Sequence, residues 1–201
     1  MTMKKINAFE QGEAILKTLS KGAFLTTAAD GKQNTMTIGW GSLGFKWGQP
    51  IFTVMVRQSR YTKELIDANP EFTVSFPVKE GFAQALGLCG SKSGRDLDKF
   101  EATGLTREKA STVNVPLVKE SPVNIECKVT QVLELGSHDM FLAKVTAVQV
   151  DESLLDEKGK LDLNKAHLVA YSHGEYQTFD NILGTFGYSV KKKDKKEKKK
   201  H

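Results

Sequence analysis

The segment NTMTIGWGSLGFKWGQPIFTVMVRQSRYTKEL, residues 34 to 65, decides the fold class of this protein. It begins as a strand, continues through a glycine-rich stretch at 39–44 and returns as a second strand at 50–56. Glycines inside a strand pattern indicate bends or the close approach of another group. A short helix at 62–69 follows, and Pro70 ends it. The segment therefore predicts two strands joined through a bend, with a helix after the second.

The flanking sequence adds further strands joined by short turns. Asp30-Gly31 predicts a tight hairpin, because both residues tolerate a positive φ. Hydrophobic and polar residues alternate along VNIECKVTQVLEL, residues 123–135, as in a strand with one buried face. Other strands are predicted at 23–29, 71–77 and 140–150, and a final apolar segment at 166–173. This pattern favours a mainly β fold, an antiparallel barrel or curled sheet, over a doubly wound parallel sheet.

Helices are predicted at the N-terminus and in one block between strands. Residues 8–19 have an amphipathic pattern that Asn7 can cap. The block at 80–106 contains helical stretches separated by a loop rich in glycine, serine and lysine. Ser93 and Asp96 have the spacing of a capping box, which predicts a helix start just after this loop.

Length and charge indicate one globular domain followed by a basic tail. The last eleven residues carry eight lysines against two acidic residues, a contribution of +6 to the net charge of +5. Residues 1–190 therefore carry −1, and we expect them to form the single domain. The tail at 191–201 has no apolar residue to bury, so we expect it to be disordered and solvated. Weak attraction to nucleic acid or anionic lipid is the alternative for such a tail.

Several functional classes are disfavoured by simple patterns. No apolar run approaches the roughly 20 residues of a membrane span. The first 19 residues interrupt their apolar positions with acidic ones, unlike a signal peptide. Cys89 and Cys127 sit in dissimilar contexts, which favours a reducing, cytoplasmic location over a disulfide framework. The histidines lack the spacing of a metal site, and no P-loop or G-x-G-x-x-G pattern occurs.

The run VRQSRYT, residues 56–62, is the first candidate for chemistry. Arg57, Arg60 and Thr62 stand between a strand and the start of a helix. Backbone N–H groups at a helix start attract anions, arginine grips phosphate through paired donors, and the threonine hydroxyl can cap the helix or contact phosphate. The alternative is that both arginines are surface residues paired with nearby carboxylates, namely Glu64, Asp67 or Glu71.

Two other stretches are candidates for contact with a planar ligand. NTMTIGWGS, residues 34–42, mixes apolar side chains, hydroxyls and glycines, as a flat heteroaromatic ligand requires. Trp40 and Trp47 can stack on such a ring or belong to the core. LCGSKSGRD, residues 88–96, can wrap a polar or anionic ligand. Cys89 within it is a reactive thiol, a buried apolar residue or a ring contact, and no histidine is placed by sequence to activate it.

Together these segments resemble the flavin reductase-like, FMN-binding split-barrel family, in particular its flavoredoxin branch. The resemblance rests first on N-x-M-T-x-x-W-G, then on P-x-x-x-V-x-V-R-x-x-R-x-T-x-x-L-I, and then on F-T-V-S. CGSKSGRDLDKF, ATGLT, IEC and LGTFGYSV continue it, so that it covers about residues 10 to 190. It implies an antiparallel split β-barrel and a homodimer that holds FMN in a groove at or near the subunit interface.

The resemblance also implies which residues hold the flavin. The phosphate contacts would be Arg57, Arg60 and Thr62, assisted by Thr35 or Ser42. The residues along the isoalloxazine and ribityl would be Asn34, Met36, Thr37, Trp40 and Gly41. The segment closing over the ring would be Cys89, Gly90, Ser91, Lys92 and Ser93, held by Asp96 and Lys99. His173 would approach the flavin or the nicotinamide.

In function, the resemblance implies an oxidoreductase that passes electrons from NAD(P)H to bound or free flavin, or onward to a protein or small acceptor. Hydride transfer from nicotinamide to flavin requires orientation more than a side-chain acid or base, so no obligate catalytic residue is expected. Two alternatives stay open: an FMN-containing electron carrier without NAD(P)H activity, and a non-catalytic flavin- or haem-related binding module.

Overall fold

The computed structural model describes residues 2–7, 22–77, 82–162, 165, 169–172 and 175–178. The helix predicted at 8–19 and the tail at 191–201 lie outside these residues. The described strands are β1 Met3–Lys5, β2 Ala23–Ala29, β3 Lys32–Ile38, β4 Gly41–Lys46, β5 Gln49–Arg57, β6 Glu71–Phe76, β7 Arg107–Glu108, β8 Leu117–Val118, β9 Val123–Glu134, β10 His138–Asp151, β11 Val169–Ser172 and β12 Glu175–Thr178. The described helices are α2 Tyr61–Ala68, α3 Phe82–Ser91, α4 Lys99–Thr103 and the 3₁₀ turn η1 Glu152–Leu154.

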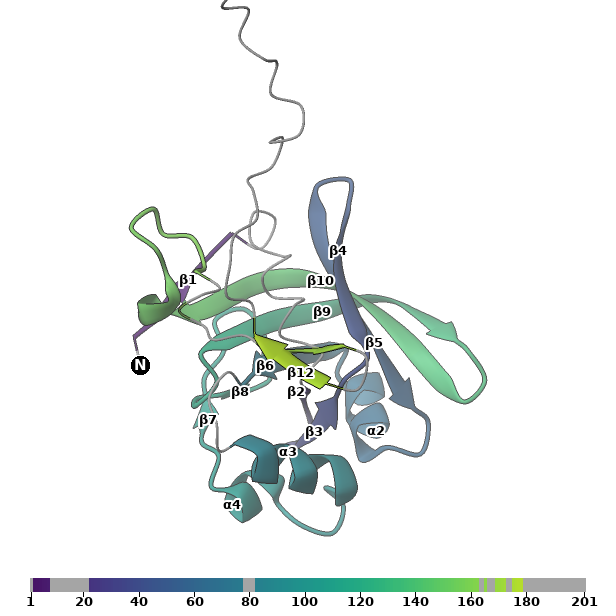
Figure 1. Ribbon diagram of the computed structural model, residues 1–201. Coiled ribbons are helices and arrows are strands. Elements are labelled where there is room, and N and C mark those ends of the chain that lie inside the picture. Colours follow the sequence, from purple (N-terminus) through teal and green to yellow (C-terminus); the bar gives the residue numbers. More distant parts are fainter. Residues whose placement is uncertain are drawn as a thin grey trace, which may run out of the picture.

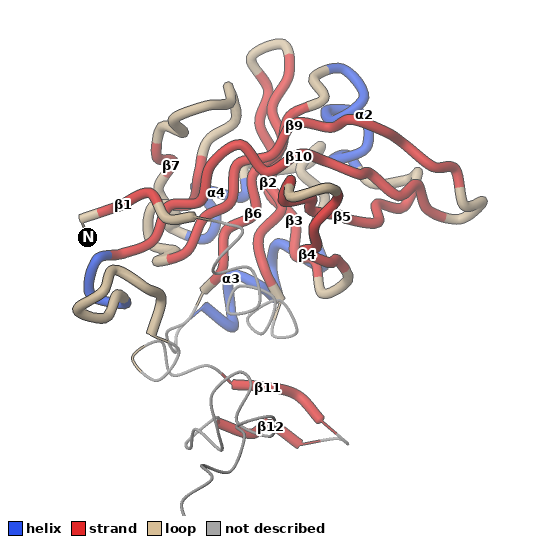
Figure 2. Tube along the Cα trace, turned by 90° about the horizontal axis from the view of Figure 1, so that it is seen from above, coloured by secondary structure: helices blue, strands red, loops and turns tan. Residues whose placement is uncertain are grey.

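One antiparallel sheet of eight strands forms the body of the protein. Its order is β3-β2-β6-β9-β10-β5-β4, and β1 pairs with β10. The sheet curls around an apolar core, and its two end strands do not pair with each other (Figures 1 and 2). All its pairs are antiparallel, which confirms the expected split barrel and excludes a doubly wound sheet.

The core explains why these strands pair in this register. Phe52 of β5 and Phe72 of β6 are fully buried and meet edge to face, with ring centroids 6.2 Å apart. Val123, Ile125 and Cys127 of β9 face the same core, as predicted. A slip of one residue would turn these side chains to the opposite face, so the core fixes the register. The alternation predicted over 123–135 is otherwise wrong, because residues 123–127 are all buried and Leu133 and Leu135 are exposed.

The first hairpin was predicted accurately, whereas the glycine-rich stretch was not. Asp30 and Gly31 form the turn between β2 and β3, with φ of 49° and 74°. The expected bend at 39–44 is instead the start of a strand, β4, that pairs with β5 through a turn at Trp47-Gly48. A Cβ added at Gly39 or Gly44 would meet nothing within 4 Å, so no group approaches these glycines closely.

The helices cover one end of the sheet. α2 packs against β2 and β3, while α3 and α4 lie beside β3 (Figure 1). The helix start predicted after Ser93 is wrong, because residues 94–96 form a turn. α4 begins at Lys99, and the Asp98 carboxylate caps it by accepting from the backbone N–H groups of Phe100 and Glu101. The loop from 91 to 98 is therefore held between two helices beside β3.

Candidate functional site

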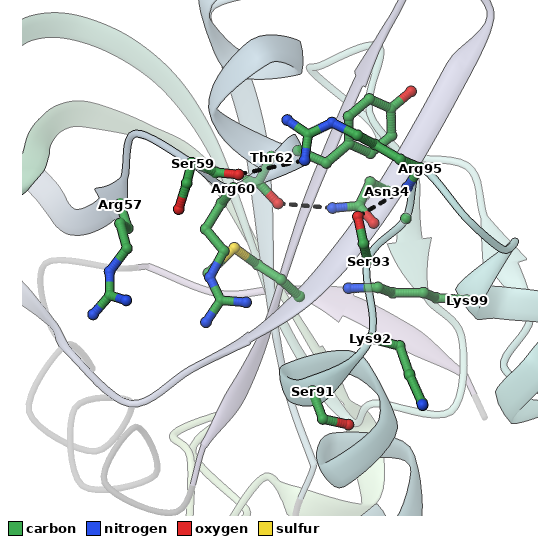
Figure 3. A pocket seen from close by; sticks show the side chains of 13 residues that line it. Asn34, Arg57, Ser59, Arg60, Thr62, Ser91, Lys92, Ser93, Arg95 and Lys99 are labelled. Atoms are coloured by element: carbon green, nitrogen blue, oxygen red, sulfur yellow. Dashed lines mark hydrogen bonds between the residues drawn. The ribbon is translucent and has the colours of Figure 1, made fainter.

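Two adjoining cavities lie where β3, β5, α2 and the loop after α3 meet. The first, which we call the cationic cavity, has a volume of about 290 Å³ and is lined by Asn34, Met36, Arg57, Ser59, Arg60, Tyr61, Thr62, Ser91, Lys92, Ser93, Gly94, Arg95 and Lys99 (Figure 3). The second, the aromatic cavity, has a volume of about 190 Å³ and is lined by Met36, Thr37, Ile38, Gly39, Trp40, Met55, Arg57, Arg60 and His138. Both share Met36, Arg57 and Arg60, so they form two ends of one groove.

The cationic cavity has five basic side chains in its lining and no carboxylate among its described lining residues. The expected alternative, surface pairing of Arg57 and Arg60, does not hold. Within the described ranges neither arginine has an ion-pair partner, and the three candidate carboxylates pair elsewhere: Glu64 with Arg95, Asp67 with Lys63, and Glu71 with Lys128. Two unpaired arginines on one wall make a site for an anion.

Lys99 strengthens this conclusion from inside the protein. Its residue is only 4% exposed, and its ammonium donates to the backbone carbonyl of Cys89 at 2.8 Å. Burial lowers the pKa of Lys99, and the nearby Arg60 charge lowers it further. In Figure 3 the Lys99 ammonium and the Arg60 guanidinium extend into the same space. A buried ammonium whose described partner is one neutral carbonyl is stabilised most effectively by a bound anion.

Asn34 and Thr62 connect the two walls of the cationic cavity. The Asn34 Nδ2 donates to the Thr62 Oγ1 at 2.7 Å, and Thr62 is the second residue of α2 rather than its cap. The Asn34 Oδ1 is buried without a hydrogen-bond partner. Gly94 lies against it so closely that an added Cβ would be 2.0 Å from this oxygen. An orphaned acceptor in the lining suits a ligand that donates from a hydroxyl.

The aromatic cavity is built for a flat ligand. Trp40 and His138 approach each other with ring centroids 6.2 Å apart, and Met36 and Met55 supply apolar contacts. Trp40 is 65% exposed, so its ring is available to a ligand or a partner. The Thr37 hydroxyl is already engaged, since it donates to the carbonyl of Leu86 at 2.6 Å and holds α3 against β3. Trp47 lies at the hairpin tip and is 97% exposed, in neither the core nor the groove.

The structure brings most of the predicted residues to this groove. Those lining the cationic cavity are Asn34, Met36, Arg57, Arg60, Thr62, Ser91, Lys92, Ser93 and Lys99. Thr37 and Trp40 line the aromatic cavity. Thr35, Gly41, Ser42, Cys89, Gly90 and Asp96 line neither cavity. His173 lies outside the described residues.

Physical reasons account for the residues that stay outside. The Thr35 hydroxyl is buried and bonded to that of Thr26 at 3.2 Å, and the Ser42 hydroxyl bonds to Thr53 at 2.5 Å on β5. Cys89 lies on the buried face of α3, and burial raises the pKa of its thiol to about 11. The thiol therefore stays protonated near neutral pH, which favours its interpretation as a buried apolar residue over a nucleophile.

Sequence reasoning missed several lining residues. Ser59, Tyr61, Gly94 and Arg95 line the cationic cavity, and all lie within segments that had been singled out. Met55 and His138 line the aromatic cavity. His138 reaches it because the β5–β10 register places it opposite Arg57, a pairing that no local pattern encodes.

Other kinds of site find no support in the described part of the chain. No group of three or more potential metal ligands occurs there. None of the helices in that part is long and apolar enough to cross a membrane.

Comparison with known proteins agrees with this geometry. The flavin reductase like domain matches residues 16–180. The flavoredoxin of Desulfovibrio vulgaris (Miyazaki F) is 29% identical, with a TM-score of 0.74 over 85% of this chain and 92% of that chain. The flavoredoxin of Methanosarcina acetivorans is 28% identical, with a TM-score of 0.72 over 85% and 91%. An FMN-binding protein from Thermus thermophilus, solved with bound 1-cyclohex-2-enone, is 28% identical, with a TM-score of 0.63 over 78% and 84%. The chain belongs to the flavin reductase-like domain family, with the split-barrel fold of that family.

Proposed function

We propose that this protein binds FMN along the groove and uses it as an oxidoreductase that accepts electrons from NAD(P)H. The observation that carries the proposal is the difference between the two ends of the groove. One end collects five basic side chains without a described carboxylate, and the other is lined by Trp40, His138 and two methionines. FMN has the matching division, with a phosphate at one end and a flat ring at the other.

The residues present fit the parts of FMN. Arg57, Arg60 and Lys99 would hold the phosphate, because none of them has a described carboxylate partner. Lys92 has no described carboxylate partner either, but its ammonium points away from Arg60 and Lys99 in Figure 3. The orphaned Oδ1 of Asn34 would accept from a hydroxyl of the ribityl chain. Met36, which lines both cavities, would lie beneath the junction of chain and ring. The similar protein from Thermus thermophilus is described as FMN-binding, which supports the same ligand here.

The side chains have a positioning role in this chemistry. Bound FMN supplies the capacity to accept a hydride from a reduced nicotinamide. Trp40, which is largely exposed beside the aromatic cavity, leaves room for a second planar molecule to approach. Arg57 and Arg60 stand where the two cavities meet and would fix the flavin at its phosphate end. No described side chain is required as an obligate acid or base, so orientation accounts for the rate.

An electron carrier that holds FMN without its own NAD(P)H activity is the second candidate. The specific observation in its favour is the similarity to two flavoredoxins at 28% and 29% identity. Both candidates use the same groove, so they differ only in whether a nicotinamide nucleotide can deliver electrons. The non-catalytic binding module differs from both, because its flavin would not change redox state.

A homodimer is part of the proposal. Exposed apolar side chains gather on the two hairpins that extend from the body: Phe45 and Trp47 on β4–β5, and Val132, Leu133 and Leu135 on β9–β10 (Figure 1). Large exposed apolar groups on protruding elements are typical of protein interfaces. A second copy packed there would cover them and would shield the open side of the groove near Trp40.

The two cysteines support a reducing, cytoplasmic location for this protein. Cys89 and Cys127 are both free and both buried within the described structure. Thiols that persist unpaired are typical of compartments with a reducing poise. We include this location in the proposal on that ground.

Anaerobic mixing of the purified protein, reconstituted with FMN, with NADH or NADPH tests the proposed activity. We expect the visible flavin absorbance to bleach with at least one nucleotide and to return on admitting oxygen. Dithionite serves as the control that the bound flavin is reducible. A yellow protein that is bleached by dithionite but by neither nucleotide would support the electron carrier and reject the NAD(P)H-dependent activity.

A further inference from the structure

A third cavity adjoins the cationic cavity on its far side. This outer polar cavity has a volume of about 590 Å³, and its lining includes Lys32 of β3 and Arg107 of β7. It shares three lining residues with the cationic cavity: Tyr61, Gly94 and Arg95. Cavities of several hundred Å³ are large enough for a nucleotide-sized group. The shared residues therefore form a wall between a phosphate-sized site and a nucleotide-sized space.

Arg95 contributes a long charged side chain to this wall. Its guanidinium donates to the backbone carbonyl of Ser59 at 3.3 Å, forms an ion pair with Glu64, and lies 5.3 Å from the centre of the Tyr61 ring. These contacts draw the side chain from the loop across to the start of α2, as Figure 3 shows. The side chains of Arg95 and Glu64 are well exposed, at 42% and 57%. An exposed ion pair contributes little free energy, so little is needed to move Arg95 out of the wall.

We propose that Arg95 sets the preference of this protein for FMN over FAD by closing the passage between the cationic and the outer polar cavity. FAD carries an adenylate joined to the same phosphate that ends FMN. With that phosphate among Arg57, Arg60 and Lys99, an adenylate extends through the shared wall, where the Arg95 side chain lies. The inference rests on the proposed FMN function and names the related cofactor that the site excludes.

The outer polar cavity carries both signs of charge, because Lys32, Arg95 and Arg107 line it together with two carboxylates. Asp96 and Asp98 line the outer polar cavity, where a second phosphate would approach them. Asp98 is held by Arg107 and by the α4 backbone, so it cannot turn away without uncapping that helix. The charge of this cavity therefore does not decide between the flavins, and the selection against FAD rests on the Arg95 side chain in the shared wall.

Titration calorimetry with FMN and with FAD, on the wild-type protein and on Arg95→Ala, tests the inference. Loss of the Arg95 charge weakens the binding of both FMN and FAD. The quantity to compare is therefore the ratio of their two dissociation constants. We expect the wild-type protein to favour FMN, and Arg95→Ala to shift the ratio toward FAD by roughly tenfold, the order expected from an exposed ion pair and a cation–π contact. Glu64→Gln, which releases Arg95 but keeps its charge, should shift the ratio in the same direction by less.

Lys144→Ala provides the matched control, because Lys144 is an exposed cation of β10 that lines none of the three cavities. Its ratio should equal that of the wild-type protein. The inference is overturned if the wild-type protein binds FAD as tightly as FMN, or if Arg95→Ala and Glu64→Gln leave the ratio unchanged. If the wild-type protein binds neither flavin, the proposed function itself fails. If it binds FMN but the substitutions leave the ratio of dissociation constants unchanged, only the role of Arg95 is rejected.

Discussion

Lys99 gives the strongest single-residue indication of an anionic ligand. Its ammonium is buried at the bottom of the cationic cavity, and its described partner is the neutral carbonyl of Cys89. Lys92 lines the same cavity but is exposed, so water already solvates its charge. Substituting each lysine in turn therefore compares the effect of a buried charge on ligand binding with that of an exposed charge in the same cavity.

Lys99→Met should weaken FMN binding by about 10- to 100-fold, because charge-assisted hydrogen bonds contribute about 1.5–3 kcal/mol. Lys92→Met should cost about 1 kcal/mol or less, since its exposed charge is screened. Flavin fluorescence titration measures both, and thermal unfolding verifies that each variant is folded. Equal losses in the two variants would contradict the assignment of Lys99 to the phosphate.

The position of Gly94 requires a glycine, because the Asn34 and Tyr61 side chains of the cationic cavity lie too close for a Cβ atom. A Cβ there would be 2.0 Å from the Asn34 Oδ1 and 3.0 Å from a Tyr61 ring carbon. Gly94→Ala should displace Asn34, weaken FMN binding, and cost about 1–3 kcal/mol of stability, as overpacking usually does. Gly44→Ala is the control, since its Cβ would meet nothing within 4 Å. Urea unfolding compares the stability of the two variants. A Gly94→Ala variant with wild-type stability and FMN affinity would show that the loop can move to accommodate a Cβ atom.

The sequence predicted those site residues whose neighbours lie in the same short segment of the chain. Arg57 and Arg60 flank a strand–helix junction, so their neighbourhood is local and readable. Arg95 and His138 reach the groove from loops and strands distant in sequence, and their positions depend on sheet register and loop path. No local signal indicates His138, whereas Arg95 belongs to LCGSKSGRD, the segment predicted to wrap a polar or anionic ligand.

Among the elements, β9 anchors a long irregular segment through Glu126. The buried Glu126 carboxylate accepts from the backbone N–H groups and hydroxyls of Ser111 and Thr112, and from the Gln149 amide. Burial alone would raise the pKa of Glu126, but these hydrogen bonds outweigh it and lower the pKa below 4.5. The segment so anchored leads from β7 to β8.

The lowered pKa gives Glu126 a defined effect on acid stability. Because its folded-state pKa is depressed, its stabilisation is present above the unfolded-state pKa and is lost as the pH falls through the folded-state value. Glu126→Gln should lower the free energy of unfolding near neutral pH by about 1–3 kcal/mol, and the gap from wild type should narrow in acid. Urea unfolding at several pH values measures this. Glu120→Gln, which alters an exposed carboxylate bonded to Thr106, is the control, and an equal effect there would argue against Glu126 as the anchor.

Elements with strong local chemistry were predicted, and those set by pairing were not. The Asp30-Gly31 turn follows from dihedral preference, and the first half of β9 follows from burial, whereas its second half is exposed on a hairpin. β4 was read as a bend because glycines disfavour strands, yet pairing with β5 overrides that preference. The Ser93 capping box failed because Asp98 supplies a better cap nearer to the helix that forms.

For the whole molecule, the two protruding hairpins are the expected dimer surface. We expect the wild-type protein to sediment as a dimer at micromolar concentrations, because Trp47 and Leu133 expose apolar surface at these hairpins. Trp47→Ser with Leu133→Ser should shift the sedimentation toward the monomer without unfolding the sheet. Lys158→Ser, a change at an exposed position away from both hairpins, serves as a control. A wild-type protein that sediments only as a monomer would contradict the dimer.

The central claim is that Arg57 and Arg60 hold the phosphate of FMN at one end of the groove. Equilibrium titration of FMN into the wild-type protein, Arg57→Ala and Arg60→Ala, with folding verified by circular dichroism, measures it directly. We expect tight binding by the wild-type protein and a loss of about 10- to 100-fold in each variant, as expected for charge-assisted phosphate contacts. Absence of FMN binding by the wild-type protein, or unchanged affinity in both variants, would contradict the claim.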